Sequence, residues 1–110
     1  MSRKYPAGAI VLVCLFGALQ TSAIAEEAKS KGAELYVTKA CAGCHGMDGR
    51  SPILPVYPKV AGQPKAYLLN QMRDIKDGSR NNGQSIAMAG VMAGVSDEEM
   101  GILADWLSRQ

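Results

Sequence analysis

The chain has 110 residues, enough for one small domain, and its 12 basic and 10 acidic residues give a formal net charge of +2. Nucleic-acid binding requires a clear excess of basic residues, so this composition excludes a nucleic-acid partner. Three cysteines and one histidine are present, and their positions carry most of the chemical information.

The first 25 residues have the three parts of a secretory signal. Two basic residues near the start precede the apolar run 9–19, and Ala23 and Ala25 form the small-x-small pattern that a signal peptidase reads. The run is too short to cross a bilayer, which requires about 20 apolar residues. We therefore predict a cleaved signal peptide over 1–25, a mature domain over 26–110 and export to a bacterial periplasm, without stable membrane insertion.

Cleavage would change the inventory of charges and thiols. Removal of Arg3 and Lys4 from the 12 basic residues leaves ten, against ten acidic ones. Cys14 is a poor site for lipid attachment, because the bulky Val13 precedes it. Its removal with the signal peptide leaves Cys41 and Cys44. A mature domain of this size often needs a disulfide, a metal or a cofactor to supplement its small core.

The mature sequence begins with a helical pattern from about Ser30. Leu35, Tyr36 and Ala40 lie on one face at helical spacing. This helix leads directly into the sequence CAGCH, residues 41–45, which holds the only histidine of the chain.

Four readings of Cys41, Cys44 and His45 are available, and three of them fit poorly. A disulfide between the cysteines would close a very small loop and remove little entropy from the unfolded chain, and it would leave His45 without a role. A redox dithiol of the thioredoxin type requires a βαβ context, which the neighbouring residues do not provide. A zinc site requires four ligands, and the mature chain has no further cysteine or histidine.

The fourth reading, covalent haem attachment, accounts for all three residues. C-x-x-C-H is the signature of c-type haem attachment. Two thiols one helical turn apart can form thioether bonds to the vinyl groups along one edge of a porphyrin, and the next imidazole can ligate the iron. We predict one haem c attached through Cys41 and Cys44, with His45 as an axial ligand.

The segment after the motif is expected to be irregular and to be followed by a helix. Residues 46–63 contain three prolines and three glycines, which predicts a loop that wraps the cofactor. Pro64 suits a first helical turn. Before Gly78, which ends the predicted helix, four apolar residues recur at helical spacing: Tyr67, Leu68, Met72 and Ile75.

The end of the chain predicts a second loop and a last helix. Residues 79–95 are rich in small residues and are expected to be irregular. Ser96 and Glu99 form a capping box. One face of the following helix carries four apolar residues: Ile102, Leu103, Trp106 and Leu107. No strand pattern is present, so the predicted fold class is all-α.

Taken in this order, the segments resemble the class I c-type cytochromes and are most similar to the cytochrome c4 and small soluble c553/c554 group. The resemblance is carried by CAGCHGMDGRSP, YPKVAGQPKAYLLNQMRDIKDGSR, IAMAGVM and SDEEMGILADWL, which cover nearly all of the mature chain. It implies N- and C-terminal helices that cross, with a middle helix around one haem. It also implies that Gly32 and Tyr36 of the first helix pack against Trp106 of the last.

The second axial ligand would be a methionine that reaches the iron from the face opposite His45. Three methionines are poorly placed, because they lie beside the motif or on predicted helices: Met47, Met72 and Met100. Met88 and Met92 remain open. Counted back from the last helix, Met88 resembles the ligand position of the family, so Met88 is our predicted iron ligand.

Further residues around the haem are assigned in the same way. The Nδ1 atom of His45 needs a hydrogen-bond acceptor so that Nε2 faces the iron. The resemblance implies a proline carbonyl, with Pro55 our first choice and Pro52 the second. Candidates for the pocket wall are six apolar residues: Tyr57, Val60, Leu68, Leu69, Met72 and Ile75. Candidates for flanking the exposed thioether edge, where partners would dock, are four basic residues: Lys39, Arg50, Lys59 and Lys65.

These expectations describe a monohaem protein that is not an enzyme. It would carry one electron at a time between redox partner proteins of a respiratory or photosynthetic chain, cycling between Fe(III) and Fe(II), as a monomer or weak dimer. One alternative is a cytochrome subunit of a periplasmic dehydrogenase complex that oxidises sulfide, sulfite or an alcohol. A second alternative is a gas-binding or peroxidatic haem protein with an open sixth position.

Overall fold

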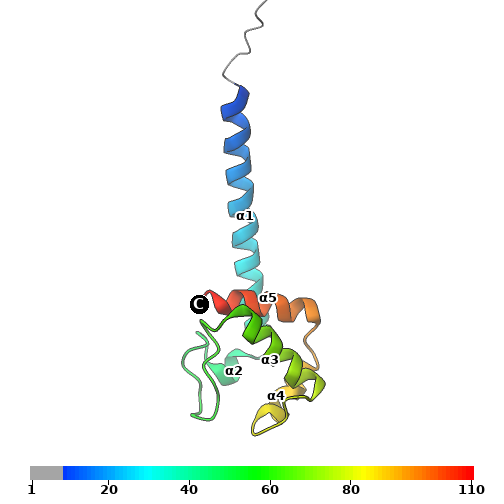
Figure 1. Ribbon diagram of the computed structural model, residues 1–110. Coiled ribbons are helices and arrows are strands. Elements are labelled where there is room, and N and C mark those ends of the chain that lie inside the picture. The colour runs from blue at the N-terminus through cyan, green and yellow to red at the C-terminus, as the bar shows by residue number, and fades with distance from the viewer. Residues whose placement is uncertain (1–8) are drawn as a thin grey trace, which may run out of the picture.

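The computed structural model describes the backbone of residues 9–110 and the side chains of residues 20–110. Within this range the chain forms five helices (Figure 1): α1 (Ala9–Thr38), α2 (Ala42–His45), α3 (Lys65–Asp77), α4 (Ser85–Met92) and α5 (Asp97–Ser108). No strand occurs between residues 9 and 110, so the all-α prediction is confirmed. The first eight residues of the predicted signal peptide lie outside the described range.

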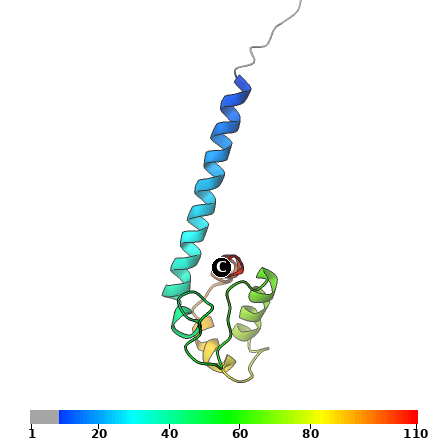
Figure 2. The ribbon, with the colours of Figure 1, turned by 90° about the vertical axis from the view of Figure 1, so that its left-hand side faces the viewer.

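Helix α1 is longer than the sequence pattern suggested, because it begins at Ala9 and not near Ser30. No glycine or proline interrupts residues 18–31, so local helix propensity is enough to extend it. Every side chain from residue 20 to residue 31 is exposed. Figures 1 and 2 show this part of α1 standing away from the rest of the molecule. Among the described residues, no helix is both long and apolar enough to cross a bilayer.

The two terminal helices cross where α1 meets α5, as the family resemblance implied. The indole of Trp106 occupies the space that a β-carbon on Gly32 would need. The rings of Tyr36 and Trp106 lie with centroids 5.1 Å apart and planes inclined by 42°. Such an aromatic pair contributes about 0.5–1.5 kcal/mol beyond the burial of its surface. The predicted packing of Gly32, Tyr36 and Trp106 is confirmed.

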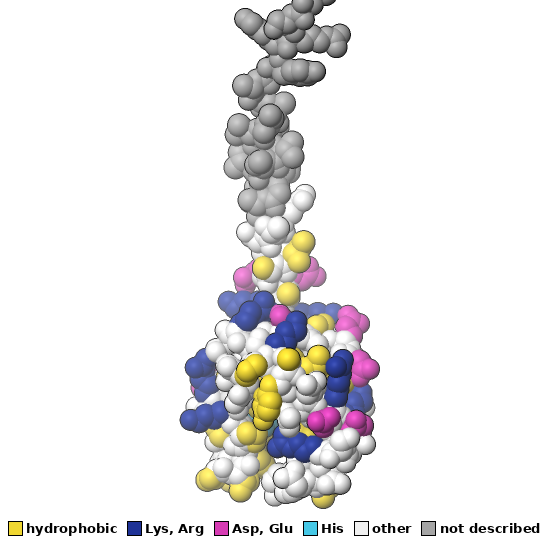
Figure 3. Space-filling model, in the orientation of Figure 1, with side chains coloured by type: hydrophobic (Ala, Val, Ile, Leu, Met, Phe, Trp, Pro, Cys, Tyr) yellow, Lys and Arg dark blue, Asp and Glu magenta, His cyan; other side chains and the backbone are white. Residues whose placement is uncertain are grey.

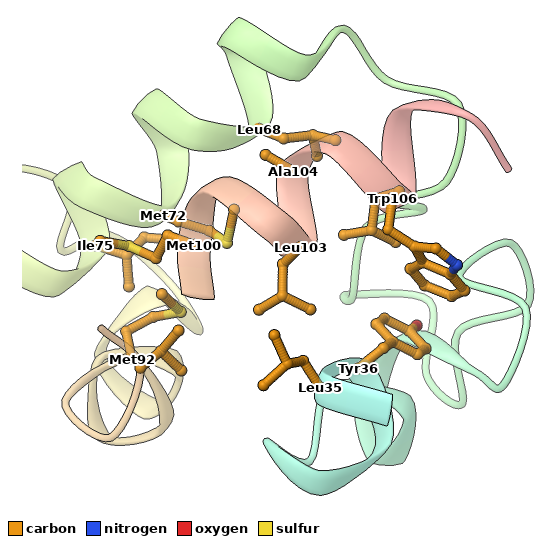
Figure 4. Packing of buried hydrophobic residues seen from close by; sticks show 12 residues of the cluster. Leu35, Tyr36, Leu68, Met72, Ile75, Met92, Met100, Leu103, Ala104 and Trp106 are labelled. Atoms are coloured by element: carbon orange, nitrogen blue, oxygen red, sulfur yellow. The ribbon is translucent and has the colours of Figure 1, made fainter. Parts of the chain in front are cut away.

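Helix α3 packs against both α4 and α5. It follows Pro64 and ends at Gly78, whose φ of 86° places it in the left-handed region that commonly closes helices. Its inner face buries Leu68, Met72 and Ile75. Figure 4 shows these side chains directed toward α5, where Met100 and Leu103 complete the core.

Helix α5 begins with the capping box that the sequence predicted. The Ser96 hydroxyl accepts a hydrogen bond from the Glu99 backbone N–H at 3.2 Å, and the Glu99 carboxylate accepts one from the Ser96 N–H at 2.9 Å. The pKa of Glu99 is lowered, first by the Ser96 N–H and then by the ammonium of Lys39.

Residues 79–95 are not irregular throughout, because helix α4 occupies Ser85–Met92. This part of the prediction was wrong. Small residues and two flanking glycines suggested a loop, but the segment between Gly83 and Gly94 consists mainly of alanine, methionine, isoleucine and valine. Burial of Ser85 and Met92 at its two ends fixes the helix against α3. The two candidate methionine ligands therefore lie on one helical element.

Candidate functional site

A cavity of about 390 Å³ opens between α2, α3, α4 and the loop 46–63. Sites for small ligands and cofactors typically span roughly 300–1,000 Å³. Side chains of low polarity predominate in its lining. The lining brings together all four residues predicted to bind the haem: Cys41, Cys44, His45 and Met88.

The cysteines reach the cavity because the chain turns sharply after α1. Ala40 has a φ of 64°, an unusual value for a residue with a side chain, and it directs the chain into the short helix α2. Cys41 is half-buried and Cys44 is exposed, and both thiols are free. Burial raises the pKa of the Cys41 thiol, and the charge of Cys44 raises it further, although a backbone hydrogen bond opposes both. Cys41 and Cys44 are therefore two separate thiols with no disulfide between them.

His45 is oriented by a proline of the following loop. The residue is only 7% exposed, and the Nδ1 atom of its ring lies 2.8 Å from the carbonyl oxygen of Pro58. A carbonyl can only accept, so Nδ1 carries the hydrogen and Nε2 keeps its lone pair free. The acceptor is Pro58, and the prediction of Pro55 or Pro52 was wrong. The physical reason is the path of the loop, because the Val60 N–H donates to the Gly49 carbonyl at 2.8 Å and draws residue 58 back toward α2.

The start of the loop is held by residues that local sequence patterns do not single out. Gly46, with a φ of 83°, approaches the Ser51 carbonyl so closely that no β-carbon would fit. The Tyr36 hydroxyl donates to the Gly46 carbonyl at 2.6 Å, and burial raises the pKa of Tyr36 to about 12. Asp48 accepts from the N–H groups of Arg50 and Ser51, and the Arg50 bond is the main cause of its lowered pKa. These contacts fix the turn that the backbone makes directly after His45.

Met88 and Met92 both line the cavity from α4, but their surroundings differ. They are four residues apart and so share one face of the helix. Met92 is 2% exposed and belongs to the hydrophobic core, where Figure 4 shows it beside Ile75 and Met100. Met88 is only partly buried and packs at the edge of that core. The side chain of Met88 is therefore less enclosed by the core than that of Met92.

The expected pocket wall is largely present. Five of its six predicted members line the cavity, and Leu69 does not, because it is partly buried against the core instead. Other lining residues were not predicted, and Gln71 and Arg80 are two polar examples. No local pattern marks them, since both are polar residues in a helix and a loop and the fold alone turns them inward.

The four basic residues expected beside the thioether edge do not form a ring around the cavity. Lys39 pairs with Glu99 at 3.1 Å, and Lys65 pairs with Asp105 at 3.2 Å. Arg50 is exposed outside the lining, so Lys59 is the one member of the four that lines the cavity. On the face shown in Figure 3, basic side chains are scattered among acidic ones, so the surface there does not carry a single sign of charge.

The donor set suits a covalently bound haem better than a bare metal ion. Within the described residues, no group of three or more histidine, cysteine, aspartate or glutamate side chains gathers in a way that could hold an ion. Two free thiols, an imidazole with its Nε2 available, a thioether and apolar walls instead face one cavity. The fold and the site together define a small all-helical domain for the attachment of a haem.

Comparison with known proteins gives the family. The family described as Cytochrome c matches residues 30–110, and the chain belongs to this family. Its cofactor is accordingly haem c, covalently bound and containing iron.

Individual relatives indicate which kind of cytochrome c the chain resembles. Cytochrome c4 of Pseudomonas aeruginosa is 38% identical over 100 residues, which are 91% of this chain and 48% of that protein. A thiosulfate dehydrogenase electron acceptor of Thiomonas intermedia is 32% identical over 99% of this chain and 47% of its own length. The crystal structure of reduced recombinant cytochrome c4 from Pseudomonas stutzeri matches with a TM-score of 0.65 and 28% identity, over 76% of this chain and 48% of that one.

These relatives confirm a class I c-type cytochrome of the c4 group, with the class I cytochrome c fold. This chain spans about half the length of each of the three.

Proposed function

We propose that this chain is a monohaem electron carrier that exchanges one electron at a time with redox partner proteins in the periplasm. The observation that carries the proposal is the convergence of one C-x-x-C-H motif and a methionine on a single apolar cavity. The name of the Thiomonas relative, an electron acceptor, supports the same role. When bound, the haem supplies reversible exchange of one electron between Fe(III) and Fe(II).

Three side chains and one carbonyl would fix the cofactor on one side. The thiols of Cys41 and Cys44 would form the two thioether bonds, and Nε2 of His45 would ligate the iron. The Pro58 carbonyl, 2.8 Å from Nδ1, holds the ring in the tautomer that leaves Nε2 free. Because the loop between Gly49 and Val60 is closed by a backbone hydrogen bond, this orientation does not depend on a mobile segment.

We assign the second axial position to Met88. Met92 is already enclosed by the core and would have to leave it to reach an iron atom, whereas Met88 is partly buried at the cavity. A thioether ligand and a largely apolar lining both favour the ferrous state over the more highly charged ferric state, which raises the reduction potential. With both axial positions filled by side chains, dioxygen and peroxide would find no open position.

Export would follow from cleavage after Ala25. The described side chains that cleavage would remove, residues 20–25, are all exposed, so cleavage would remove no buried side chain among them. Helix α1 would then run from Glu26 to Thr38 and would keep the turns that pack on α5. The mature protein would lie in the periplasm without stable membrane insertion, as a monomer or weak dimer.

The thioether edge is the proposed point of electron exchange. Cys44 is exposed, and Ile53, whose N–H donates to the Cys44 carbonyl at 3.1 Å, is 63% exposed beside it. An apolar and accessible edge of this kind allows close approach of another redox centre. Since Lys39 and Lys65 are paired with carboxylates, we expect only a weak dependence of partner association on salt.

A second candidate is a cytochrome subunit of a periplasmic dehydrogenase complex, which the name of the Thiomonas relative also favours. Purification from the native membrane-free extract distinguishes the two. A free carrier elutes alone at the size of residues 26–110, whereas a subunit co-elutes with a flavin-, molybdenum- or quinone-containing protein.

The open-site alternative is tested with carbon monoxide. The reduced holoprotein should show almost no spectral change on exposure to the gas, because a methionine occupies the sixth position. Rapid and complete formation of a carbon monoxide adduct would contradict the carrier proposal.

A further inference from the structure

Helix α4, which carries Met88, has little support from the other helices. Among the helices of residues 9–110, only α3 has a backbone close to that of α4. Figures 1 and 2 show α4 at the edge of the molecule that lies farthest from the exposed part of α1. The position of α4 therefore depends on α3 and on the two short connections that join α4 to α3 and to α5. Any movement of α4 would shift Met88 with respect to the cavity.

The connection between α4 and α5 is held by two lysines. The Lys39 ammonium donates to the Gly94 carbonyl at 2.8 Å, and the Lys76 ammonium donates to the Val95 carbonyl. Within residues 20–110, no backbone N–H donates to either of these carbonyls, so the lysines supply the hydrogen bonds that the backbone does not. A cation is also favourable beside the C-terminal end of a helix. The two ammonium groups thus fix the point where α4 ends and the chain turns toward α5.

Lys76 has no other recorded role, whereas Lys39 has two. Lys76 lies in the last turn of α3 and takes part in none of the ion pairs recorded among residues 20–110. Lys39 also pairs with Glu99 at 3.1 Å, so its removal would disturb the start of α5 as well. The hydrogen bond from Lys76 is partly buried although the residue as a whole is exposed, and its acceptor residue Val95 is 1% exposed. Lys76 therefore connects the end of α3 to a buried point just beyond α4.

We propose that Lys76 is a positioning residue for the second axial ligand, because its bond to the Val95 carbonyl restrains α4 and so keeps Met88 on the iron. This inference rests on the proposed function, since it requires Met88 to be that ligand. An added ligand such as imidazole binds the ferric iron only while Met88 is detached. The apparent affinity for imidazole therefore reports the fraction of molecules in which α4 has moved far enough to release Met88.

The experiment is a titration of the ferric holoprotein with imidazole, followed by loss of the methionine-to-iron charge-transfer band. Lys76→Met keeps an apolar side chain but removes the ammonium, and it should raise the apparent affinity for imidazole by about threefold to tenfold, the factor that corresponds to one hydrogen bond. Arg73→Met is the control for charge, because it removes a cation from an exposed position on the same helix. Gly32→Ala is the control for stability, because its β-carbon would meet Trp106 at the crossing of α1 and α5. Both controls should reproduce the wild-type affinity.

An unchanged affinity in Lys76→Met, or an equal rise in either control, would overturn the inference. If Lys76→Met does not accumulate as holoprotein, Lys76→Gln is measured instead. Its shorter and uncharged side chain should give a rise in the same direction, and an unchanged affinity would again overturn the inference. A charge-transfer band that is missing from the unsubstituted ferric protein, or one that survives Met88→Ala, is a separate result. It would count against Met88 as the ligand in the proposed function, and the inference would fall with that assignment.

Discussion

The backbone of Gly32 lies directly against the β-carbon and indole of Trp106, with no space between them for a side chain. This contact sets how closely α1 and α5 cross. We expect Gly32→Ala to destabilise the holoprotein by about 1–3 kcal/mol, because the helices must move apart or the indole must leave its rotamer. Urea unfolding followed by tryptophan fluorescence measures the loss.

Gly101→Ala is the control for this substitution. Gly101 lies inside α5, and a β-carbon there would meet nothing within 4 Å. The same chemical change should therefore stabilise the protein by about 0.5–1 kcal/mol through helix propensity. Equal effects at the two positions would show that the crossing is not sterically limited at Gly32.

Tyr36 connects the crossing of the helices to the haem motif. Its hydroxyl donates to the carbonyl of Gly46, the residue after His45. Tyr36→Phe should cost about 0.5–1.5 kcal/mol in the free energy of unfolding, the net value of one hydrogen bond, because the Gly46 carbonyl still accepts from the Gly49 N–H. Tyr67→Phe, at a side chain that is 50% exposed, should change the stability by less than about 0.5 kcal/mol. Similar losses in the two variants would contradict this role.

Glu99 should make the stability of the protein depend on acid pH. Its pKa is lowered below the ordinary 4.5, so its carboxylate stabilises the fold at neutral pH, and this contribution is lost as the pH falls through the lowered pKa. Glu99→Gln should reduce the unfolding midpoint at neutral pH, and the gap to wild type should close below pH 4.5. Glu98→Gln, in the same first turn of α5, is the control and should leave the acid dependence unchanged. A gap that persists in acid would contradict the assigned cause.

The two methionines of α4 should respond in opposite ways to truncation. Met88→Ala should abolish the methionine-to-iron charge-transfer band of the ferric protein and allow the ferrous protein to bind carbon monoxide. Met92→Ala should retain the band but lose about 2–5 kcal/mol of stability, because it leaves a cavity in the core. Met92→Leu, which conserves volume, should lose less than about 1.5 kcal/mol. Loss of the band in Met92→Leu but not in Met88→Ala would reverse the assignment.

The parts of this protein that could be predicted from sequence are those governed by local rules. The Ser96 capping box, the end of α3 at Gly78 and the apolar faces of α3 and α5 follow from residue type and spacing over a few positions. Helix α4 was not predicted, because its small residues are compatible with both a loop and a helix. Its packing against α3 favours the helix.

The details of the site depended on the path of the chain. Pro52, Pro55 and Pro58 are chemically equivalent acceptors, and only the hydrogen bond that closes the loop at Gly49 selects the third. Arg80 likewise reaches the cavity only because α3 ends where it does. Family resemblance, in contrast, correctly indicated the contact of Gly32 and Tyr36 with Trp106, which lies far away along the chain.

The most direct test of the central claim is the intact mass of the exported protein, produced in a bacterial host that has haem-ligation machinery and analysed under denaturing conditions. We predict the mass of residues 26–110 plus one haem, with an alkaline pyridine spectrum of the c type, and loss of the added mass when Cys41 and Cys44 are both replaced by alanine. A colourless protein with the mass of the polypeptide alone would contradict covalent haem attachment, and with it the proposed electron transfer.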